Sequence, residues 1–325
     1  MIDILYILIG LVFLFFGGEG LLKGSVSLAK TFGLSTLLVS MVVVGFGTSA
    51  PELMVSATAA LRDAPGIALG NVVGSNIANI LLILGLAATI MAIDCRRWEI
   101  KRDAITVMAA SLLLAAFCVM GEIGRISGGI MLFLLVSYLS YAYWAEKRAK
   151  PRTQMDNDQG FRQALEEDIG PAKDIGPVKA TFYSIGGMLF LAAGAHLLVE
   201  GATSIARQFG ISDAVIGLSL VAIGTSLPEV ATAIVAAARK HGDVIIGNVM
   251  GSNLFNILSI LGITALISPI PVDPRIAAMD IWIMLAVAVV LTPIIWTGHK
   301  INRFEGIGFL ALYAGYIGWL ALTGI

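Results

Sequence analysis

The stretch that decides the fold is GFGTSAPELMVSA, residues 45–57, together with a near copy, AIGTSLPEVATAI, at residues 222–234. Each lies inside a long apolar run, yet each contains a proline followed by a glutamate. Pro51 and Pro228 have no backbone N–H, and each ring clashes with the carbonyl four residues earlier, so both runs are expected to break or kink in their middle. The chain carries the same interruption twice.

The composition indicates the surroundings of these runs. The 325 residues are 58% hydrophobic and 13% charged, and the mean hydropathy is +0.90. This is too apolar for a soluble globular domain, so we expect a lipid bilayer around the chain and no nucleic-acid partner. Runs that reach the roughly 20 residues needed to span hydrocarbon predict ten transmembrane helices, near 3–22, 35–61, 65–93, 103–121, 127–145, 180–199, 212–238, 244–268, 277–297 and 304–324.

The basic residues predict the orientation, because Lys and Arg concentrate in cytoplasmic loops. If the N-terminus is outside, seventeen of the 21 Lys and Arg residues fall in inside loops. The outside loops then keep only Arg62, Arg125, Arg207 and Arg275. We therefore expect both termini to be extracytoplasmic. The first run has no basic region before it and no small-residue cleavage site, so it is interpreted as a retained helix.

The sequence is an internal repeat. Adding 177 to the distinctive residues of the first half reaches their counterparts in the second, and LGNVVGSNIANILLILG (69–85) matches IGNVMGSNLFNILSILG (246–262) at twelve of seventeen positions. The expected divisions are a first repeat at 1–145, a polar cytoplasmic linker at 146–179 and a second repeat at 180–325. The linker is interpreted as a solvated connection, with a regulatory module as the alternative.

The parity of the helices predicts how the repeats are oriented. Each repeat holds five predicted helices, an odd number, so the second copy must enter the membrane from the opposite side. The expected fold class is an all-α integral membrane protein with two inverted-topology five-helix repeats, whose broken helices meet at a midplane site. The alternative is a duplication that left two structural copies without a shared site.

The repeated motifs place ionisable groups beside the breaks. Glu52 lies four residues after Thr48, and Glu229 four residues after Thr225, so each carboxylate shares a helix face with a hydroxyl. A carboxylate inside the bilayer is costly and indicates a functional site. The alternative is a protonated glutamate that hydrogen-bonds to a neighbouring helix.

A second motif adds polar stripes to otherwise apolar helices. The stripe residues have the spacing i, i+4, i+8 and are Asn71, Ser75 and Asn79 in the first repeat and Asn248, Ser252 and Asn256 in the second. Such residues can be ion ligands, or they can hold transmembrane helices together. Gly70, Gly74, Gly247 and Gly251 are expected to permit close helix approach under either interpretation.

Together these groups form an oxygen-only site. Carboxylates, hydroxyls, amide carbonyls and freed backbone carbonyls suit hard cations, so Ca²⁺ or Na⁺ is the expected cargo. The motifs contain no thiol and no imidazole, which argues against zinc, and we expect no cofactor. Cys95 and Cys118 lie at opposite ends of one predicted helix, too far apart for a disulfide. Competition of two ions for one alternately exposed site is antiport.

GTSAPE with GNVVGSNIAN, and GTSLPE with GNVMGSNLFN, closely resemble the two alpha repeats of the sodium/calcium exchanger family. The resemblance covers the whole chain, and the short linker is similar to that of prokaryotic members. It implies exchange of Ca²⁺ for Na⁺ across the prokaryotic inner membrane. It also implies that the first and sixth helices slide past a core formed by the other eight.

The resemblance implies a set of ion ligands. Glu52 and Glu229 match the central ligands of Ca²⁺ and Na⁺. Matching hydroxyl or carbonyl ligands are Thr48, Ser49, Ser75, Thr225, Ser226 and Ser252; Gly45 and Ala222 match positions whose backbone carbonyls bind Na⁺, and Asn79 and Asn256 match the remaining pair. Some prokaryotic members carry aspartate at the position of Asn256, whereas this chain has asparagine in both repeats.

Other polar residues receive structural interpretations. Glu19 and His196 occupy equivalent positions in the two repeats, and an interfacial role is favoured over proton coupling or gating. Asp103 and Asp280 are predicted to cap the N-termini of the fourth and ninth helices.

Three other functions are alternatives to sodium-coupled exchange. A proton-coupled calcium exchanger on the same fold is the nearest alternative, but the matched hydroxyls favour Na⁺ because a proton needs no cage of oxygens. An intramembrane hydrolase with Ser49 as nucleophile needs a base nearby, and neither motif contains histidine. A channel is chemically compatible with the same residues.

Overall fold

The computed structural model describes residues 2–61, 65–148, 176–208 and 222–322. The helical segments, with η for π-helical turns, are α1 (Ile2–Phe32), α2 (Thr36–Val39), η1 (Ser40–Gly45), α3 (Phe46–Thr48), α4 (Ala50–Leu61), α5 (Pro65–Ala78), η2 (Asn79–Leu84), α6 (Gly85–Ile90), α7 (Trp98–Val119), α8 (Arg125–Arg148), α10 (Gly176–Gln208), α12 (Ala222–Thr225), α13 (Leu227–Ala238), α14 (Gly242–Leu254), η4 (Phe255–Ile260), α15 (Leu261–Ile267), η5 (Ile276–Asp280), α16 (Ile281–Pro293), η6 (Ile294–Gly298) and α17 (Arg303–Leu322). Four two-residue strands complete the set: β1 (Ile93–Asp94), β2 (Glu122–Ile123), β3 (Ile270–Pro271) and β4 (Lys300–Ile301).

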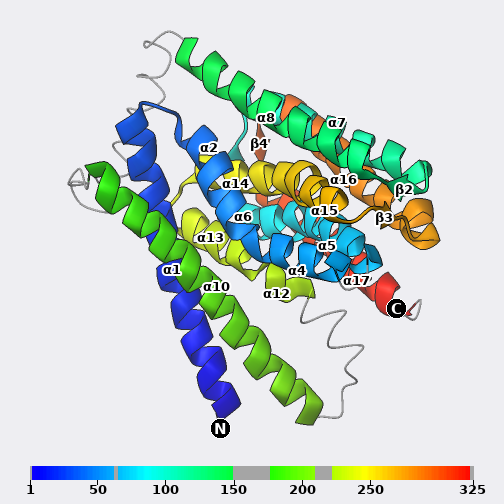
Figure 1. The fold of residues 1–325 in the computed structure, drawn as a ribbon. Helices are drawn as coiled ribbons and strands as arrows, with labels where there is room; N and C mark the ends of the chain where they lie inside the picture. Colours follow the sequence, from blue (N-terminus) through cyan, green and yellow to red (C-terminus); the bar gives the residue numbers. More distant parts are fainter. Residues whose placement is uncertain (1, 62–64, 149–175, 209–221, 323–325) are drawn as a thin grey trace.

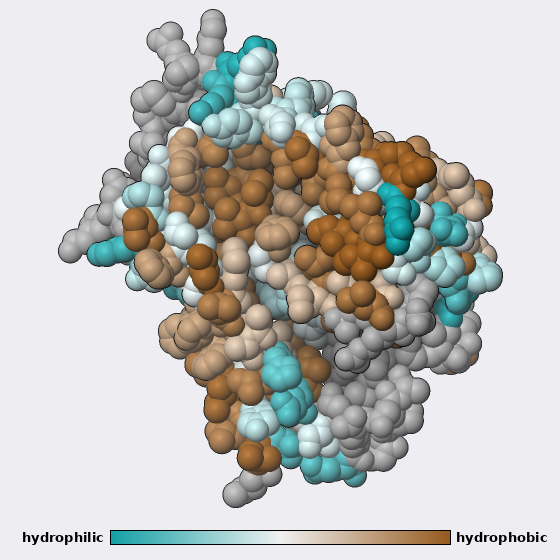
Figure 2. Space-filling model, in the orientation of Figure 1, coloured by the Kyte–Doolittle hydropathy of each residue, from teal (hydrophilic) through white to brown (hydrophobic). Residues whose placement is uncertain are grey.

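The chain is a multi-pass membrane protein. Within the described ranges, seven helices are long and apolar enough to cross a bilayer, and counting the bent pair Thr36–Thr48 and Ala50–Leu61 as one span gives eight. This count does not reach the ten predicted helices. Of the run predicted at 212–238, the structure describes the residues from Ala222 onward. These residues include the short helix α13. Large apolar side chains stay exposed on the surface, and brown atoms cover much of the face in Figure 2.

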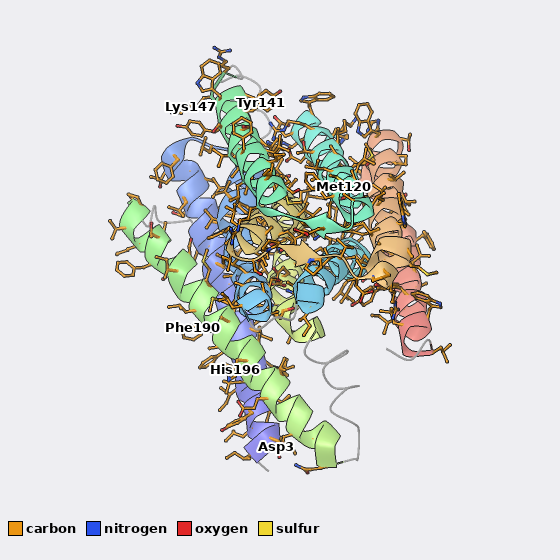
Figure 3. All side chains as sticks on the ribbon, turned by 45° about the vertical axis from the view of Figure 1, so that its right-hand side comes forward. Asp3, Met120, Tyr141, Lys147, Phe190 and His196 are labelled. Atoms are coloured by element: carbon orange, nitrogen blue, oxygen red, sulfur yellow. The ribbon has the colours of Figure 1, made fainter. Side chains whose placement is uncertain are left out.

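Two long helices form a unit at one side of the molecule. Helices α1 and α10 have 31 and 33 residues, well beyond the predicted runs 3–22 and 180–199, and they project from the bundle in Figures 1 and 3. They pack antiparallel through glycines. A Cβ added at Gly10 would lie 2.8 Å from the carbonyl oxygen of Gly194, and one at Gly187 would lie 2.8 Å from that of Gly17. Because the offset of 177 relates Gly10 to Gly187 and Gly17 to Gly194, these contacts are reciprocal.

The remaining helices pack around one fully buried helical segment. The helix from Gly242 to Ile267 is buried along its whole most apolar stretch, and it contacts η1, α7, α8 and α13. Helix α17 packs on α6 and η2, and α16 packs on α7. The core therefore surrounds the segments that carry the two sequence motifs.

Two small sheets join the first half of the chain to the second. β1 pairs antiparallel with β4, with Ile93 opposite Ile301, and β2 pairs antiparallel with β3, with Ile123 opposite Ile270. Ile270 is the counterpart of Ile93 at the offset of 177. Ile301 is the counterpart of Ile123 at an offset of 178, because one residue is added in the loop before β4. The two sheets are therefore equivalent, and each takes one strand from each half.

The predicted N-caps at Asp103 and Asp280 are wrong. Asp103 lies inside α7, where it accepts hydrogen bonds from the hydroxyl of Tyr138 on α8 and from Arg102 Nε at 2.8 Å. Asp280 makes no cap hydrogen bond and accepts a 3.1 Å bond from the hydroxyl of Tyr316 on α17. Both aspartates connect a helix to the one that follows it by a hydrogen bond from a tyrosine.

Cys95 and Cys118 are free and buried, in line with the expectation that they do not form a disulfide.

Candidate ion-binding site

The proline motifs interrupt both helices at a serine. The first bends by 42° between Thr48 and Ala50, and Ser49 at the bend has φ −81° and ψ 5°. In the second, Ser226 has nearly the same conformation, φ −88° and ψ 5°, and Pro228 follows in the first turn of α13. The sequence therefore located both interruptions, and the serine at each interruption lies two residues before the proline.

The two carboxylates of the motifs are buried and reach across to the opposite repeat. Glu52 and Glu229 are each 1% exposed. Ser226 Oγ donates to Glu52 Oε1 at 3.3 Å, and Ser49 Oγ donates to Glu229 Oε1 at 3.2 Å. In both glutamates the other oxygen, Oε2, is buried with no hydrogen-bond partner in the described ranges. The structure thus brings the acid pair together and leaves one acceptor on each acid.

The polar stripes flank these carboxylates. Asn71 Nδ2 donates to the backbone oxygen of Glu52 at 3.3 Å and to Ser56 Oγ at 3.0 Å. Thr48 Oγ1 donates to Asn248 Oδ1 at 3.2 Å. The three contacts join the two arms of the first broken helix to asparagine-bearing helices, the arm of Glu52 to α5 and the arm of Thr48 to α14. Both stripes therefore face the first helix break.

Ser252 and Gly45 lie against each other, as expected if both belong to one site. Ser252 Oγ donates to the Gly45 carbonyl at 3.3 Å and also lies 3.4 Å from Asn248 Oδ1. This close approach of the two helices requires glycine at the contact. A Cβ at Gly45 would lie 2.9 Å from Ser252 N, and one at Gly251 would lie 2.3 Å from the Met41 carbonyl oxygen.

The glycine prediction is met in one repeat. Gly247, like Gly251, packs against the helix before the first break, with 2.7 Å between an added Cβ and the Leu37 carbonyl oxygen. A Cβ at Gly74 would meet nothing within 4 Å among the described residues. The segment that corresponds to Leu37–Met41, at 214–218, lies outside those residues.

Two π-helical turns contain the last asparagine pair. Asn79 begins η2, and Asn256 lies in η4. Asn79 Nδ2 donates to Asn253 Oδ1 at 3.3 Å, while Asn79 Oδ1 and both polar atoms of the Asn256 side chain are buried without a partner in the described chain. Such turns often mark functional sites because they leave backbone carbonyls free.

The remaining predicted ligands are placed less fully. Ser75 is buried on α5, Thr225 is half-buried at the end of α12, and Ala222 begins α12. Asn253 contacts the predicted site but was not among the predicted ligands. The signal was present, since Asn253 belongs to the same GSN motif as Ser252.

The donor set is suited to a hard cation. Among the predicted ligands in the described ranges, Glu52, Glu229, Asn79 and Asn256 each have a buried side-chain oxygen without a hydrogen-bond partner. No cluster of three His, Cys, Asp or Glu side chains occurs in the described part of the chain, so the negative charge of this region comes from two carboxylates. An oxygen-only set with two charges can hold Ca²⁺ or Na⁺.

Comparison with known proteins identifies the family. The sequence profile of the family described as sodium/calcium exchanger protein matches residues 2–144 and 179–322. The chain belongs to this family. Its members are transporters, cation/Ca²⁺ antiporters for which the ions are transported substrates.

Similar proteins cover the chain almost completely. The putative antiporter CaxA of Alkalimonas amylolytica is 34% identical over 97% of this chain and 98% of its own length. The sodium/calcium exchanger MaX1 of Methanosarcina acetivorans is 31% identical over 97% of both chains. The structure of the sodium-calcium exchanger NCX_Mj soaked with 2.5 mM Na⁺ and 1 mM Sr²⁺ aligns with a TM-score of 0.82, at 31% identity over 98% of each chain. The Ca²⁺/H⁺ antiporter ChaA of Bacillus subtilis is a more distant relative, 27% identical over 82% of this chain and 78% of its own.

Proposed function

We propose that the exchanger moves Ca²⁺ against Na⁺ through one alternately exposed site between Glu52 and Glu229. The observation that carries this proposal is the crossed pairing of the two acids. Each accepts a hydroxyl hydrogen bond from the other repeat through Oε1 and keeps Oε2 buried and unpaired. A buried charge without a partner is costly, and a bound cation between the acids removes that cost.

The ligands of the ion are the groups around this pair. Thr48, Ser49, Thr225 and Ser226 supply oxygens at the breaks, Ser75, Ser252, Asn79 and Asn256 supply them from the packed helices, and Gly45 and Ala222 supply backbone carbonyls. One Ca²⁺ is neutralised by the two carboxylates. Three Na⁺ ions bound by the same oxygens would give the site a net positive charge. The exchange of three Na⁺ for one Ca²⁺ therefore carries charge across the membrane.

The architecture of the proposal is two inverted five-helix repeats, 1–145 and 180–325, joined by a cytoplasmic linker at 146–179. Both termini are extracytoplasmic. The reciprocal sheet pairs β1–β4 and β2–β3 and the reciprocal glycine contacts of α1 and α10 support a two-fold relation between the repeats. Such repeats form a central site that each side of the membrane reaches in turn.

Proton-coupled exchange is the second candidate, and the relation to ChaA favours it. The hydroxyls of Ser49 and Ser226 favour Na⁺, since they add oxygen ligands that a proton does not require. The test is ⁴⁵Ca²⁺ uptake into proteoliposomes with Na⁺, H⁺ and K⁺ gradients imposed separately. Sodium coupling predicts uptake driven by an outward Na⁺ gradient at equal pH. Uptake driven only by the proton gradient would replace it with the second candidate.

A further inference from the structure

Helix α1 packs on one of the two broken helices and is fastened there by an ion pair. Along one side of α13, Ala231, Val235 and Arg239 succeed one another at four-residue spacing. Gly18 of α1 fits against the first two, with 3.0 Å between an added Cβ and Val235 Cγ2. Beside it, Glu19 Oε1 accepts a hydrogen bond from Arg239 Nε at 2.8 Å and forms an ion pair with the same guanidinium, 2.7 Å from Nη2.

The corresponding contact of the second repeat is different. Met54 of α4, the counterpart of Ala231, is 68% exposed, so α10 does not cover α4 as α1 covers α13. His196 of α10, the counterpart of Glu19, has a side chain 78% exposed, and its Nε2 lies 3.4 Å from Glu200 of the same helix. Figure 3 shows His196 on the projecting part of the helix pair. Among the described residues, α1 therefore covers α13, whereas α10 leaves α4 uncovered at Met54.

The two repeats also differ in sequence at this contact. The counterpart of Arg239 is Arg62, so the cation occurs in both repeats, whereas the anion Glu19 is replaced by His196. In a transporter of inverted repeats, the two access states exchange the environments of corresponding elements. By this symmetry, α10 covers α4 in the second state, and His196 takes the place that Glu19 has here. Histidine and arginine cannot form a pair of opposite charges.

We propose that the Glu19–Arg239 ion pair is a latch, formed in only one of the two access states, that shifts the conformational equilibrium toward the state described here. The inference rests on the alternating access of the proposed function. An interaction shifts an equilibrium only by its difference between the two states, and this pair has no equivalent in the second one. The side chains of Arg239 and Glu19 are 37% and 28% exposed, so solvent screens the pair in part. An effect of about three- to tenfold on the ratio of the states is expected for a partly screened pair.

The direction follows from the positions of the two residues. Arg239 lies at the end of α13 opposite to Glu229, ten residues along the helix, or about 15 Å at the rise of an α-helix. By the predicted orientation this end faces the cytoplasm. The latch therefore holds the cytoplasmic side closed and leaves the side of Met54 open.

The test measures how often α10 covers α4, and it does not require transport activity. A cysteine at Met54 (M54C) in protein reconstituted in nanodiscs reports the state through its rate of reaction with a maleimide. Glu19→Gln and Arg239→Gln should each lower that rate, by no more than about three- to tenfold, because α10 then covers α4 more often. The exchange of charges, Glu19→Arg with Arg239→Glu, should restore the rate. Glu200→Gln is the matched control, since it removes a carboxylate whose pair lies within α10, and it should leave the rate unchanged.

A gain-of-function variant separates the latch from a purely structural pair. His196→Glu supplies an anion at the position that corresponds to Glu19, so it should stabilise the second state and lower the M54C rate even with Glu19 in place. Unchanged rates in Glu19→Gln, or failure of the charge exchange to restore them, would overturn the latch. Parallel measurements of ⁴⁵Ca²⁺ flux in the same variants test sodium coupling separately from the latch. If a Na⁺ gradient drives no Ca²⁺ flux in the parent protein, sodium coupling is refuted, and the labelling rates still decide whether the latch exists.

Discussion

Ser49 of the first half of the chain donates a 3.2 Å hydrogen bond to Glu229 of the second half, and Ser226 returns the same contact to Glu52 at 3.3 Å. Each helix break therefore orients the carboxylate that follows the opposite break. Because Oε1 is held by the serine, the free Oε2 atoms have fixed positions and need little rearrangement to bind an ion.

Removing either carboxylate charge should nearly abolish Ca²⁺ transport. Glu52→Gln or Glu229→Gln leaves one negative charge against a divalent ion in a buried site, and breaking a buried charge pair costs about 3–5 kcal/mol. The measurement is ⁴⁵Ca²⁺ flux in proteoliposomes, with Glu200→Gln as an exposed glutamate control. Near-normal flux in either site variant would refute the shared site.

Removing a serine hydroxyl should weaken Ca²⁺ binding without abolishing it. Ser49→Ala deletes a charge-assisted hydrogen bond, worth about 1.5–3 kcal/mol, so the apparent affinity should fall about tenfold or more. Ser226→Ala should have a similar effect, because it deletes the equivalent bond to Glu52. Titration of ⁴⁵Ca²⁺ binding measures both, and a normal affinity in both variants would count against these serines as site residues.

Neighbouring glycines of α10 should respond differently to alanine. In Gly187→Ala the added Cβ would lie 2.5 Å from Leu21 N, whereas in Gly186→Ala it meets nothing within 4 Å. Overpacking of this kind costs about 1–3 kcal/mol, so Gly187→Ala should lower the thermal midpoint of the purified protein. Gly186→Ala is the control. Equal midpoints would show that α1 and α10 do not depend on this close contact.

Exchange should respond to membrane potential. If Glu52 and Glu229 supply the only two negative charges of the proposed site, it is neutral with one Ca²⁺ and positive with three Na⁺, so an exchange of three Na⁺ for one Ca²⁺ moves charge. Each elementary charge that crosses 100 mV is worth about 2.3 kcal/mol. An inside-negative potential set with valinomycin should therefore speed Na⁺ entry and Ca²⁺ exit. A rate and end point independent of the potential would contradict this charge count.

The native cysteines should not react in the folded protein. Cys95 is fully buried in the loop after β1, and burial raises the pKa of its thiol to about 12. The reactive thiolate is then absent at neutral pH, and Cys118 is buried as well. Maleimide should label the parent chain only after denaturation.

Because the native cysteines do not react, an added cysteine can report the orientation of the chain. Gln159→Cys in the linker should be labelled by an impermeant reagent from the cytoplasmic side alone. Labelling of intact cells from outside would reverse the predicted orientation.

The sequence predicted the parts of the site that depend on local chemistry. Pro51 and Pro228 indicated both helix breaks because proline cannot complete a helix, and the spacing of Asn248 and Ser252 gave the face that α14 turns toward the first break. The crossed bonds between serine and glutamate were not predicted, because they join residues from opposite halves of the chain. Asn253 was missed because it falls about 100° around a regular helix from the Ser252 stripe.

Other features depended on packing that no local pattern records. Apolar length predicted α1 and α10 at about the thickness of a bilayer, whereas the helices continue through polar residues, and their glycines contact each other along the shared face. The aspartates at 103 and 280 lie near predicted helix starts, which suggested caps. Their tyrosine partners are 35 and 36 residues further along the chain, beyond the range of any capping motif.

The paired sheets have a consequence for how the chain is made. Ile93 and Ile123 emerge during synthesis long before Ile301 and Ile270, the residues opposite them in the two sheets. Until the second half arrives, the first half presents two short unpaired backbone edges, and the second half brings the complementary pair. Neither half can complete its own sheets, so both sheets can form only after the second half of the chain has been made.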